Sequence, residues 1–169
     1  MTGIAATADG PGHAPTDIDV SAVAALLFAP DGRYLMQKRD ERPEARMAGH
    51  WGAFGGQVDA HETPREALIR EIREELSFEP ADARWFTEIL YCLHQVGRRF
   101  HRKHFFEVPV TAEDIARMTL NEGAEMRLFT FGELAAQPRV VPWDCYGVML
   151  HARREDVFGS YLSARDRAR

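Results

Sequence analysis

The segment from Thr63 to Leu76 restricts the fold and chemistry of this chain more than any other part of the sequence. Thr63 suits the N-cap of a helix, Pro64 suits its first position, and Glu66 can complete a capping box with Thr63. Apolar residues recur at helical spacing along one side of the segment, namely Leu68, Ile69, Ile72 and Leu76. The sequence therefore predicts an amphipathic helix over 64–76, with one side packed against a core.

Three carboxylates occupy the side of this helix next to the apolar stripe. At about 100° per residue, Glu71, Glu74 and Glu75 fall within one sector, because they are three and four positions apart. Like charges this close repel each other, and the repulsion grows when the groups are partly buried. A hard divalent cation such as Mg²⁺ would neutralise them, since it prefers carboxylate and carbonyl oxygens. The alternative is a solvated helix held by pairs such as Arg70–Glu74.

The residues before and inside the helix fit a fixed spacing. Gly56 is followed after five residues by Glu62, and after seven more by the run Arg70-Glu71-Ile72-Arg73-Glu74-Glu75. This spacing resembles the Nudix box, G-x5-E-x7-R-E-U-x-E-E-x-G-U, in which U is a bulky apolar residue. Chance agreement is on the order of one in 10⁵ at ordinary residue frequencies. One position departs from the pattern, because Ser77 stands where the helix should end in a left-handed glycine.

The resemblance to the Nudix family implies a metal centre on the helix. Glu74 and Glu75 would bind Mg²⁺ together with the backbone carbonyl of Gly55, and Mn²⁺ can substitute for Mg²⁺. Glu71 would be the base that activates water, or a ligand shared between metal ions. The bound cation would neutralise a diphosphate and orient water for in-line attack on phosphorus.

Other residues would support this centre. The resemblance implies that Arg70 pairs with a carboxylate and fixes its rotamer. Glu62 would brace the loop against the helix. His61 is expected to be a turn residue. The candidates for substrate binding are Arg39, Gly56 and Glu122, of which Glu122 lies where many relatives supply an extra carboxylate.

The rest of the chain alternates between strand and helix character. Apolar runs bounded by turn residues predict strands over 20–29, 34–39, 51–58, 83–96, 100–110 and 126–131. Further helices are predicted over 112–118, 131–136 and 142–157. Long strands mixed with a few helices indicate an α/β fold with a mixed sheet. The resemblance implies, more specifically, a Nudix-type α/β/α sandwich.

Length and composition agree with a single domain. The 169 residues suit one core, expected over 18–158, between a disordered tail over 1–17 and a polar tail over 159–169. No apolar run approaches the roughly 18 residues of a membrane span, and the N-terminus has no signal-peptide pattern, so a cytoplasmic location is expected. The formal net charge of -5 argues against nucleic acid as a partner. Cys92 and Cys145 are expected to be free, buried thiols.

Three weaker features leave alternatives open. A basic run is interpreted as a solvated turn and edge strand or as a phosphate-attracting rim; it comprises Arg98, Arg99, His101, Arg102, Lys103 and His104. A zinc site from His94, His101 and His104 fits no usual spacing. Each of Trp51, Trp85 and Trp143 is expected in the core rather than as a base-stacking platform.

The expected function is a Mg²⁺-dependent hydrolase that cleaves a diphosphate linkage in a nucleoside diphosphate joined to another group. A nucleoside triphosphate and a nucleotide sugar are both open as substrates, because the box acts on the diphosphate alone. One alternative is a non-catalytic Nudix domain that senses a nucleotide or binds a partner. Another is a pyrophosphohydrolase of RNA 5′ ends. The resemblance also leaves a homodimer open.

Overall fold

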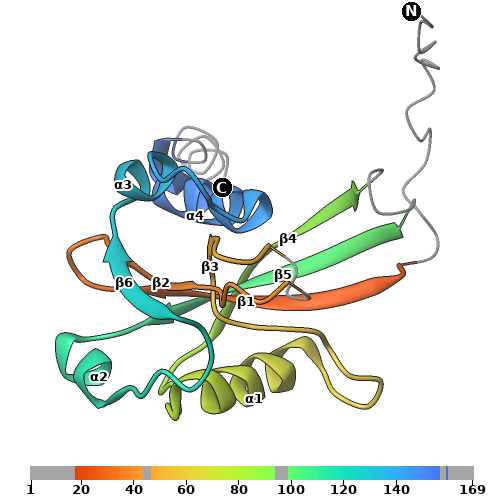
Figure 1. The fold of residues 1–169 in the computed structure, drawn as a ribbon, viewed down its shortest axis with the longest axis horizontal. Helices are drawn as coiled ribbons and strands as arrows, with labels where there is room; N and C mark the ends of the chain where they lie inside the picture. Colours follow the sequence, from red (N-terminus) through yellow and green to blue (C-terminus); the bar gives the residue numbers. More distant parts are fainter. Residues whose placement is uncertain (1–17, 44–46, 94–98, 157–158, 160–169) are drawn as a thin grey trace, which may run out of the picture.

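One mixed sheet organises the chain, which the computed structural model describes over residues 18–43, 47–93, 99–156 and 159. Its strands are β1 (Val20–Phe28), β2 (Tyr34–Lys38), β3 (Trp51–Gly52), β4 (Arg84–Leu93), β5 (Arg99–Pro109) and β6 (Glu125–Phe129). The helices are α1 (Pro64–Leu76), α2 (Ala112–Arg117), α3 (Phe131–Ala135) and α4 (Pro142–Ala152). Figure 1 shows α1 and α2 on one side of the sheet and α3 and α4 on the other. The predicted α/β sandwich is confirmed.

The strand order is β3-β2-β1-β5-β4, and β6 pairs with β2 on its other side. β1 and β5 are parallel along the whole of β1, whereas the other strand pairs are antiparallel. The segment 51–57 fits between β2 and β1, because Gly52 pairs with Gln37 while Phe54 bridges to Ala25. This insertion brings the two glycines at 55 and 56 to the middle of the sheet, beneath α1.

Two cores fill the spaces between the layers, because successive side chains of a strand point to opposite faces. Val23, Ala25 and Leu27 of β1 pack on the side of α1, together with Leu68 and Ile72 of that helix. Ala24 and Leu26 pack on the opposite side, with Leu134 of α3 and Val148 of α4. β1 is therefore buried on both faces, as its continuous apolar run predicts.

The basic run does not form a solvated edge. β5 lies between β1 and β4, so His101, Lys103 and His104 are buried. Lys103 forms an ion pair with Asp144 of α4. Both sequence-based interpretations are therefore wrong for these three residues, because the strand order places them inside the sheet. Arg98 and His94 lie outside the described residues.

Other differences are local. Trp85 is 58% exposed rather than in the core, because β4 is the edge strand and has a bulge between Trp85 and Thr87. Trp51 is buried as predicted, and Trp143 is half-buried and stacks on Tyr91. α4 ends at Ala152, earlier than predicted. Its expected continuation to 157 reaches residues outside the described ones.

Cys92 and Cys145 are free, as predicted, but only half-buried. The predicted tails, 1–17 and 159–169, fall on residues that are not described, apart from 159. Across the described residues, no helix is both long enough and apolar enough to cross a membrane.

Candidate functional site

Helix α1 begins and ends as its sequence predicts. Thr63 accepts a hydrogen bond from the backbone of Glu66, and the Glu66 carboxylate accepts one from the backbone of Thr63 at 2.8 Å. Ser77 adopts the left-handed conformation expected of the missing glycine, with φ 49° and ψ 36°. Buried Leu68, Ile72 and Leu76 fix the rotation of the helix. This rotation turns the carboxylate side toward the glycine loop.

The C-terminal end of α1 is held by the loop that leads into β6. The side-chain amide of Asn121 donates to the carbonyl of Glu74 and to Oγ of Ser77, both at 2.8 Å. Backbone donors of Thr119 and Asn121 reach the carbonyls of Leu76 and Glu75. These bonds satisfy carbonyls that a helix end leaves without partners. They also bring Glu122, the next residue of the loop, beside the carboxylates of α1.

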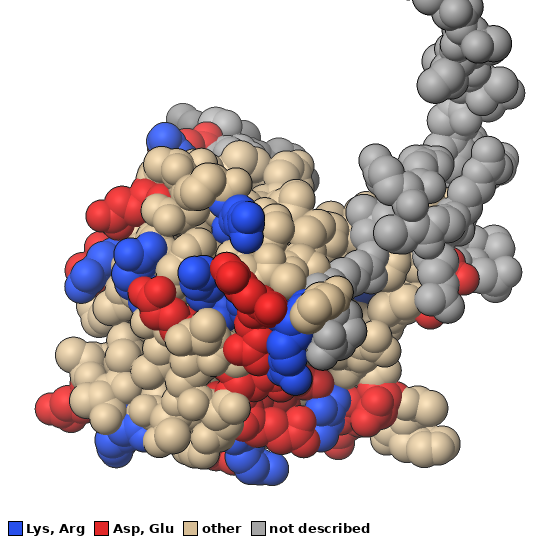
Figure 2. Space-filling model, viewed as in Figure 1, with Lys and Arg blue, Asp and Glu red and all other residues tan. Residues whose placement is uncertain are grey.

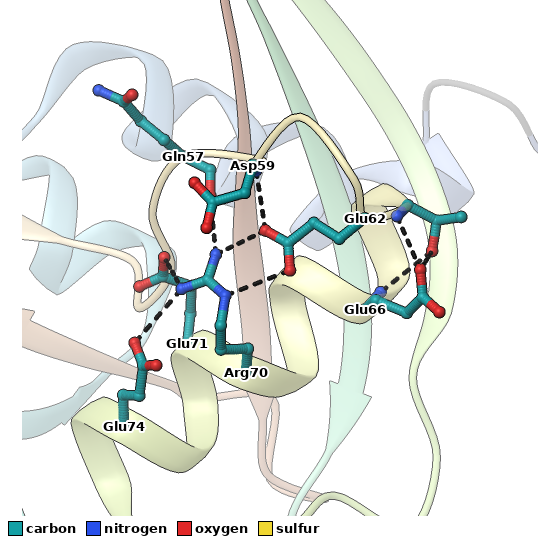
Figure 3. Close-up of polar contacts among 8 residues, drawn as sticks. Gln57, Asp59, Glu62, Glu66, Arg70, Glu71 and Glu74 are labelled. Atoms are coloured by element: carbon teal, nitrogen blue, oxygen red, sulfur yellow. Dashed lines mark hydrogen bonds and ion pairs between the residues drawn. The ribbon is translucent and has the colours of Figure 1, made fainter.

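Arg70 contacts four other residues of the site (Figure 3). Its guanidinium donates to Glu62 and Glu71 at 2.7 Å and to the carbonyl of Gln57 at 3.0 Å. A longer contact of 3.3 Å reaches Glu74. These carboxylates raise the pKa of Arg70 above its usual value, Glu62 contributing most. The predicted pairing of Arg70 with a carboxylate is thus present in the structure.

Glu62 sits between the loop and the helix. Its carboxylate accepts from the backbone of Asp59 at 2.8 Å as well as from Arg70. The hydrogen bond from Arg70 holds the pKa of Glu62 below its usual value, and the Asp59 backbone adds to the effect. These contacts are those expected of a residue that braces the loop against α1.

Glu71 packs directly on Gly56. A side chain at position 56 would start within 2.6 Å of the carboxylate carbon of Glu71, so only glycine leaves room for this approach. Burial raises the pKa of Glu71, while the hydrogen bond from Arg70 opposes the rise. Nearby Glu74 and Glu122 raise it further. A glutamate in this environment accepts a proton more readily than one in water.

Glu75 is the most deeply buried carboxylate of the cluster, at 6% exposure. Gln37 of β2 donates to one of its oxygens at 2.9 Å, and the backbone of Gly55 donates to the other at 2.8 Å. Burial raises the pKa of Glu75 to about 7, with Glu71 and Glu122 contributing. Gly55 reaches this position with φ +128°, a conformation that favours glycine.

Two substrate-binding candidates meet Glu75 in a small pocket. Arg39 and Glu122 line a space of about 40 Å³ with Gln37 and Glu75. The structure therefore brings Arg39, Glu75 and Glu122 together, although they lie far apart in the sequence. Gln37 was not predicted, since nothing in a strand of apolar and polar residues marks one glutamine as the partner of a buried carboxylate.

The donor set fits a hard divalent cation. The candidate ligands are oxygen atoms, and nearby Glu74 and Glu122 raise the pKa of Glu71, an unfavourable interaction that a bound cation would relieve. Within the described residues, however, no three His, Cys, Asp or Glu side chains converge as a ready metal site. Glu74 is 60% exposed and turned toward Arg70. Figure 2 shows the acidic residues as a band over α1.

A buried ion pair also supports the site and was missed by sequence reasoning. Lys103 of β5 donates to Asp144 of α4 at 2.5 Å. The second oxygen of Asp144 accepts from the backbone of Ala53 at 3.0 Å. Asp144 therefore ties α4 both to β5 and to the segment that leads into Gly55. Lys103 and Ala53 are 41 and 91 residues away from Asp144 along the chain, so no local sequence pattern could reveal these contacts.

Comparison with known proteins agrees with this geometry. The sequence profile of the NUDIX domain matches residues 19–146. The CTP pyrophosphohydrolase of Escherichia coli (strain K12) is 34% identical over 89 residues, which are 52% of this chain and 61% of that protein. The RNA pyrophosphohydrolase of Gluconacetobacter diazotrophicus is 40% identical over 62 residues, 35% of this chain and 37% of that protein. The chain thus matches less than two thirds of either relative's length.

A solved structure shows the same fold. The MutT NUDIX hydrolase from Burkholderia pseudomallei superposes with a TM-score of 0.64 at 23% identity. The match covers 77% of this chain and 95% of that one. The likeness therefore extends beyond the box to the sheet and the helices on both of its faces.

Proposed function

The chain belongs to the Nudix family, and from this premise we propose that it hydrolyses a diphosphate linkage in a nucleoside diphosphate joined to another group. The observation that carries the proposal is the complete acidic set of the box. Glu71 packs against Gly56, and Glu75 accepts hydrogen bonds from Gly55 and Gln37. Mg²⁺ would be held by Glu71, Glu74, Glu75 and the carbonyl of Gly55, and Mn²⁺ can substitute.

The chain's own residues divide the chemical work. When bound, the cation neutralises the phosphates and acidifies the attacking water. Glu71 is the proposed base: it takes a proton as the water oxygen bonds to phosphorus and the anhydride P–O bond breaks. Arg70 holds Glu71 in place through its 2.7 Å contact. The products are two phosphorylated fragments, and no covalent enzyme intermediate is required.

Arg39 is proposed to contact the substrate phosphates. It lines the small pocket with Glu122 and with Glu75, one of the carboxylates that would hold the metal. Arginine binds phosphate oxygens through two parallel donors, which fixes orientation as well as charge. Glu122 is the proposed additional carboxylate, since it adds to the raised pKa of both Glu71 and Glu75.

A nucleoside triphosphate is the favoured substrate class, supported by the likeness to a CTP pyrophosphohydrolase. A nucleotide sugar remains the rival, because the box residues contact only the diphosphate. The likeness to an RNA pyrophosphohydrolase favours RNA 5′ ends as a second candidate, and the net charge of -5 argues against it. A cytoplasmic location and a homodimer stay predictions.

The test is turnover by purified protein with Mg²⁺ or Mn²⁺, measured by chromatographic separation of the two phosphorylated products formed from nucleoside triphosphates, nucleotide sugars and triphosphorylated RNA. Glu74→Gln should lower kcat at least about 100-fold, because it removes a proposed metal ligand without adding bulk. Glu79→Gln is the matched control, since both side chains are 60% exposed and pair with an arginine. Full activity of the Glu74→Gln protein would contradict the site. Silence of the wild type across the panel would favour a non-catalytic nucleotide-binding domain.

A further inference from the structure

Ser77 is the one specified position of the box at which this chain departs from the Nudix pattern, and the proposed function makes no use of it. It ends α1 in the left-handed conformation, with φ 49° and ψ 36°. A serine is less stable than a glycine in this conformation, because its Cβ lies too close to the following carbonyl oxygen. What serine adds at this position is a hydroxyl group, and that group has a specific partner.

The hydroxyl group of Ser77 accepts a hydrogen bond from the loop between α2 and β6. Nδ2 of Asn121 donates to Oγ of Ser77 and to the carbonyl of Glu74, both at 2.8 Å. The backbone of Asn121 donates to the carbonyl of Glu75, also at 2.8 Å. A side-chain amide nitrogen has two N–H donors, so each of them has its own acceptor on α1. A glycine at position 77 would leave one of the two without its acceptor.

The other end of this loop is attached to β2. The backbone of Ala124 donates to the carbonyl of Lys38 at 2.8 Å. Gly123 approaches the same carbonyl with φ +94°, so closely that a side chain there would start 3.0 Å from its oxygen. Glu122 therefore lies between Asn121, which is bonded to α1, and two residues that are fixed against β2. Its position depends on both attachments.

The position of Glu122 matters to the carboxylates of α1. Its side chain lines the small pocket with Glu75 and Arg39, and its charge raises the pKa of both Glu71 and Glu75. The side chain is exposed, and among the described residues it has no hydrogen-bond or ion-pair partner. The backbone of the loop alone therefore holds this carboxylate near the others, and the bond between Asn121 and Ser77 is part of that support.

We propose that Ser77 is a positioning residue for the metal centre: its hydroxyl group holds Asn121, and through it Glu122, close enough to α1 to share a divalent cation. This inference rests on the proposed function, in which Glu122 is the additional carboxylate. The alternative is a purely structural role, in which Asn121 caps α1 and the affinity for the cation does not depend on position 77. Restoring the box with Ser77→Gly separates the two, because glycine relieves backbone strain and removes the hydroxyl group.

Binding of Mn²⁺ to the full chain without substrate tests the inference independently of turnover. Free Mn²⁺ is measured by electron paramagnetic resonance, and urea unfolding of the metal-free protein is measured alongside. Ser77→Gly and Ser77→Ala both remove the hydroxyl group, but only Ser77→Gly relieves the left-handed strain. Met47→Gly is the matched control, because Met47 is the other described non-glycine residue with a positive φ and lies in the connection between β2 and β3.

Affinity and stability should respond differently. Each Ser77 variant should weaken Mn²⁺ binding about fivefold, the effect of one lost hydrogen bond, while Met47→Gly leaves Kd unchanged. The urea midpoint of Ser77→Gly should not fall, because relief of the left-handed strain offsets the lost bond. Glu122→Gln should weaken Mn²⁺ binding about tenfold in the wild type but only about twofold in Ser77→Gly, because the two residues act through one contact.

Two results would overturn the inference. One is an unchanged Kd for Mn²⁺ in both Ser77 variants, which would leave only the structural role. The other is a full tenfold effect of Glu122→Gln in the Ser77→Gly protein, since position 77 would then act independently of Glu122. Failure of the proposed metal centre itself is recognised separately: Glu74→Gln would then bind Mn²⁺ as the wild type does, and the inference would fall with it.

Discussion

Replacing Gly56 with alanine would place one methyl group against the carboxylate of Glu71. The added carbon would lie 2.6 Å from the carboxylate carbon and 2.7 Å from Oε2. Gly56 itself does not have a positive φ, so alanine causes no backbone strain there. The conflict is relieved only if the Glu71 carboxylate withdraws by roughly 1 Å, a misplacement that can cost about 100-fold in rate. The substitution therefore moves the proposed base while leaving its chemistry unchanged.

Stability should respond much less than activity. The clashing atoms are the end of a flexible side chain, so we expect the free energy of unfolding to change by less than about 1 kcal/mol. Gly55→Ala is the contrast, because its methyl group would meet the carbonyl of Val23 at 2.5 Å and its φ is +128°. That strain should cost about 1–3 kcal/mol or more.

The assay compares kcat with urea unfolding for both variants. We expect Gly56→Ala to lose about 100-fold in kcat with near-native stability, and Gly55→Ala to lose stability as well. If Gly56→Ala keeps kcat within about threefold of the wild type, the position of the Glu71 carboxylate does not limit the reaction, and the reasoning is refuted.

Three further predictions concern stability. Asn121→Ala removes two hydrogen bonds at the end of α1 and should cost about 1 kcal/mol in urea unfolding; an unchanged midpoint would contradict the capping role. Leu68→Ala opens the core on the α1 side and should cost about 2–5 kcal/mol, against a small effect of Leu90→Ala on the exposed edge. Burial lowers the pKa of His151 from its usual 6.5, so this histidine is protonated at a higher pH in the unfolded chain than in the folded protein. The free energy of unfolding should therefore decrease as pH falls below about 6.5. His151→Gln should reduce the loss of stability between pH 7 and 5. Part of the loss should remain, because burial also lowers the pKa of His104. If stability depends on pH in the variant as it does in the wild type, His151 is not a source of the loss.

The sequence predicted the helix of the site almost completely. The limits of α1, its capping box and the left-handed Ser77 all agree with the structure, because these features depend on residues within four positions of one another. The same holds for β1, whose unbroken apolar run indicated burial on both faces. The spacing of the box also located Arg70 close enough to pair with Glu62 and Glu71.

The environment of the carboxylates could not be predicted in this way. Burial raises the pKa of Glu75 to about 7, and Glu71 and Glu122 add to the rise, while hydrogen bonds from Gln37 and Gly55, in two other segments, oppose it. Glu122 reaches the site only because Asn121 caps α1 across the 47 residues that separate it from Glu74. Contacts of this kind depend on which strands pair, and the residue pattern within one segment does not indicate its pairing partner.

The sequence by itself determined the spacing of the carboxylates, the helix that carries them and the family to which the chain belongs. Local spacing sufficed, since side chains three and four positions apart share one face of a helix. Only the tertiary structure decided that the basic run of β5 is buried, that Trp85 is exposed, and that Lys38, Arg127 and Arg139 surround one pocket. The reason is that burial and charge at these positions follow from the strand order, which brings together residues far apart in the chain.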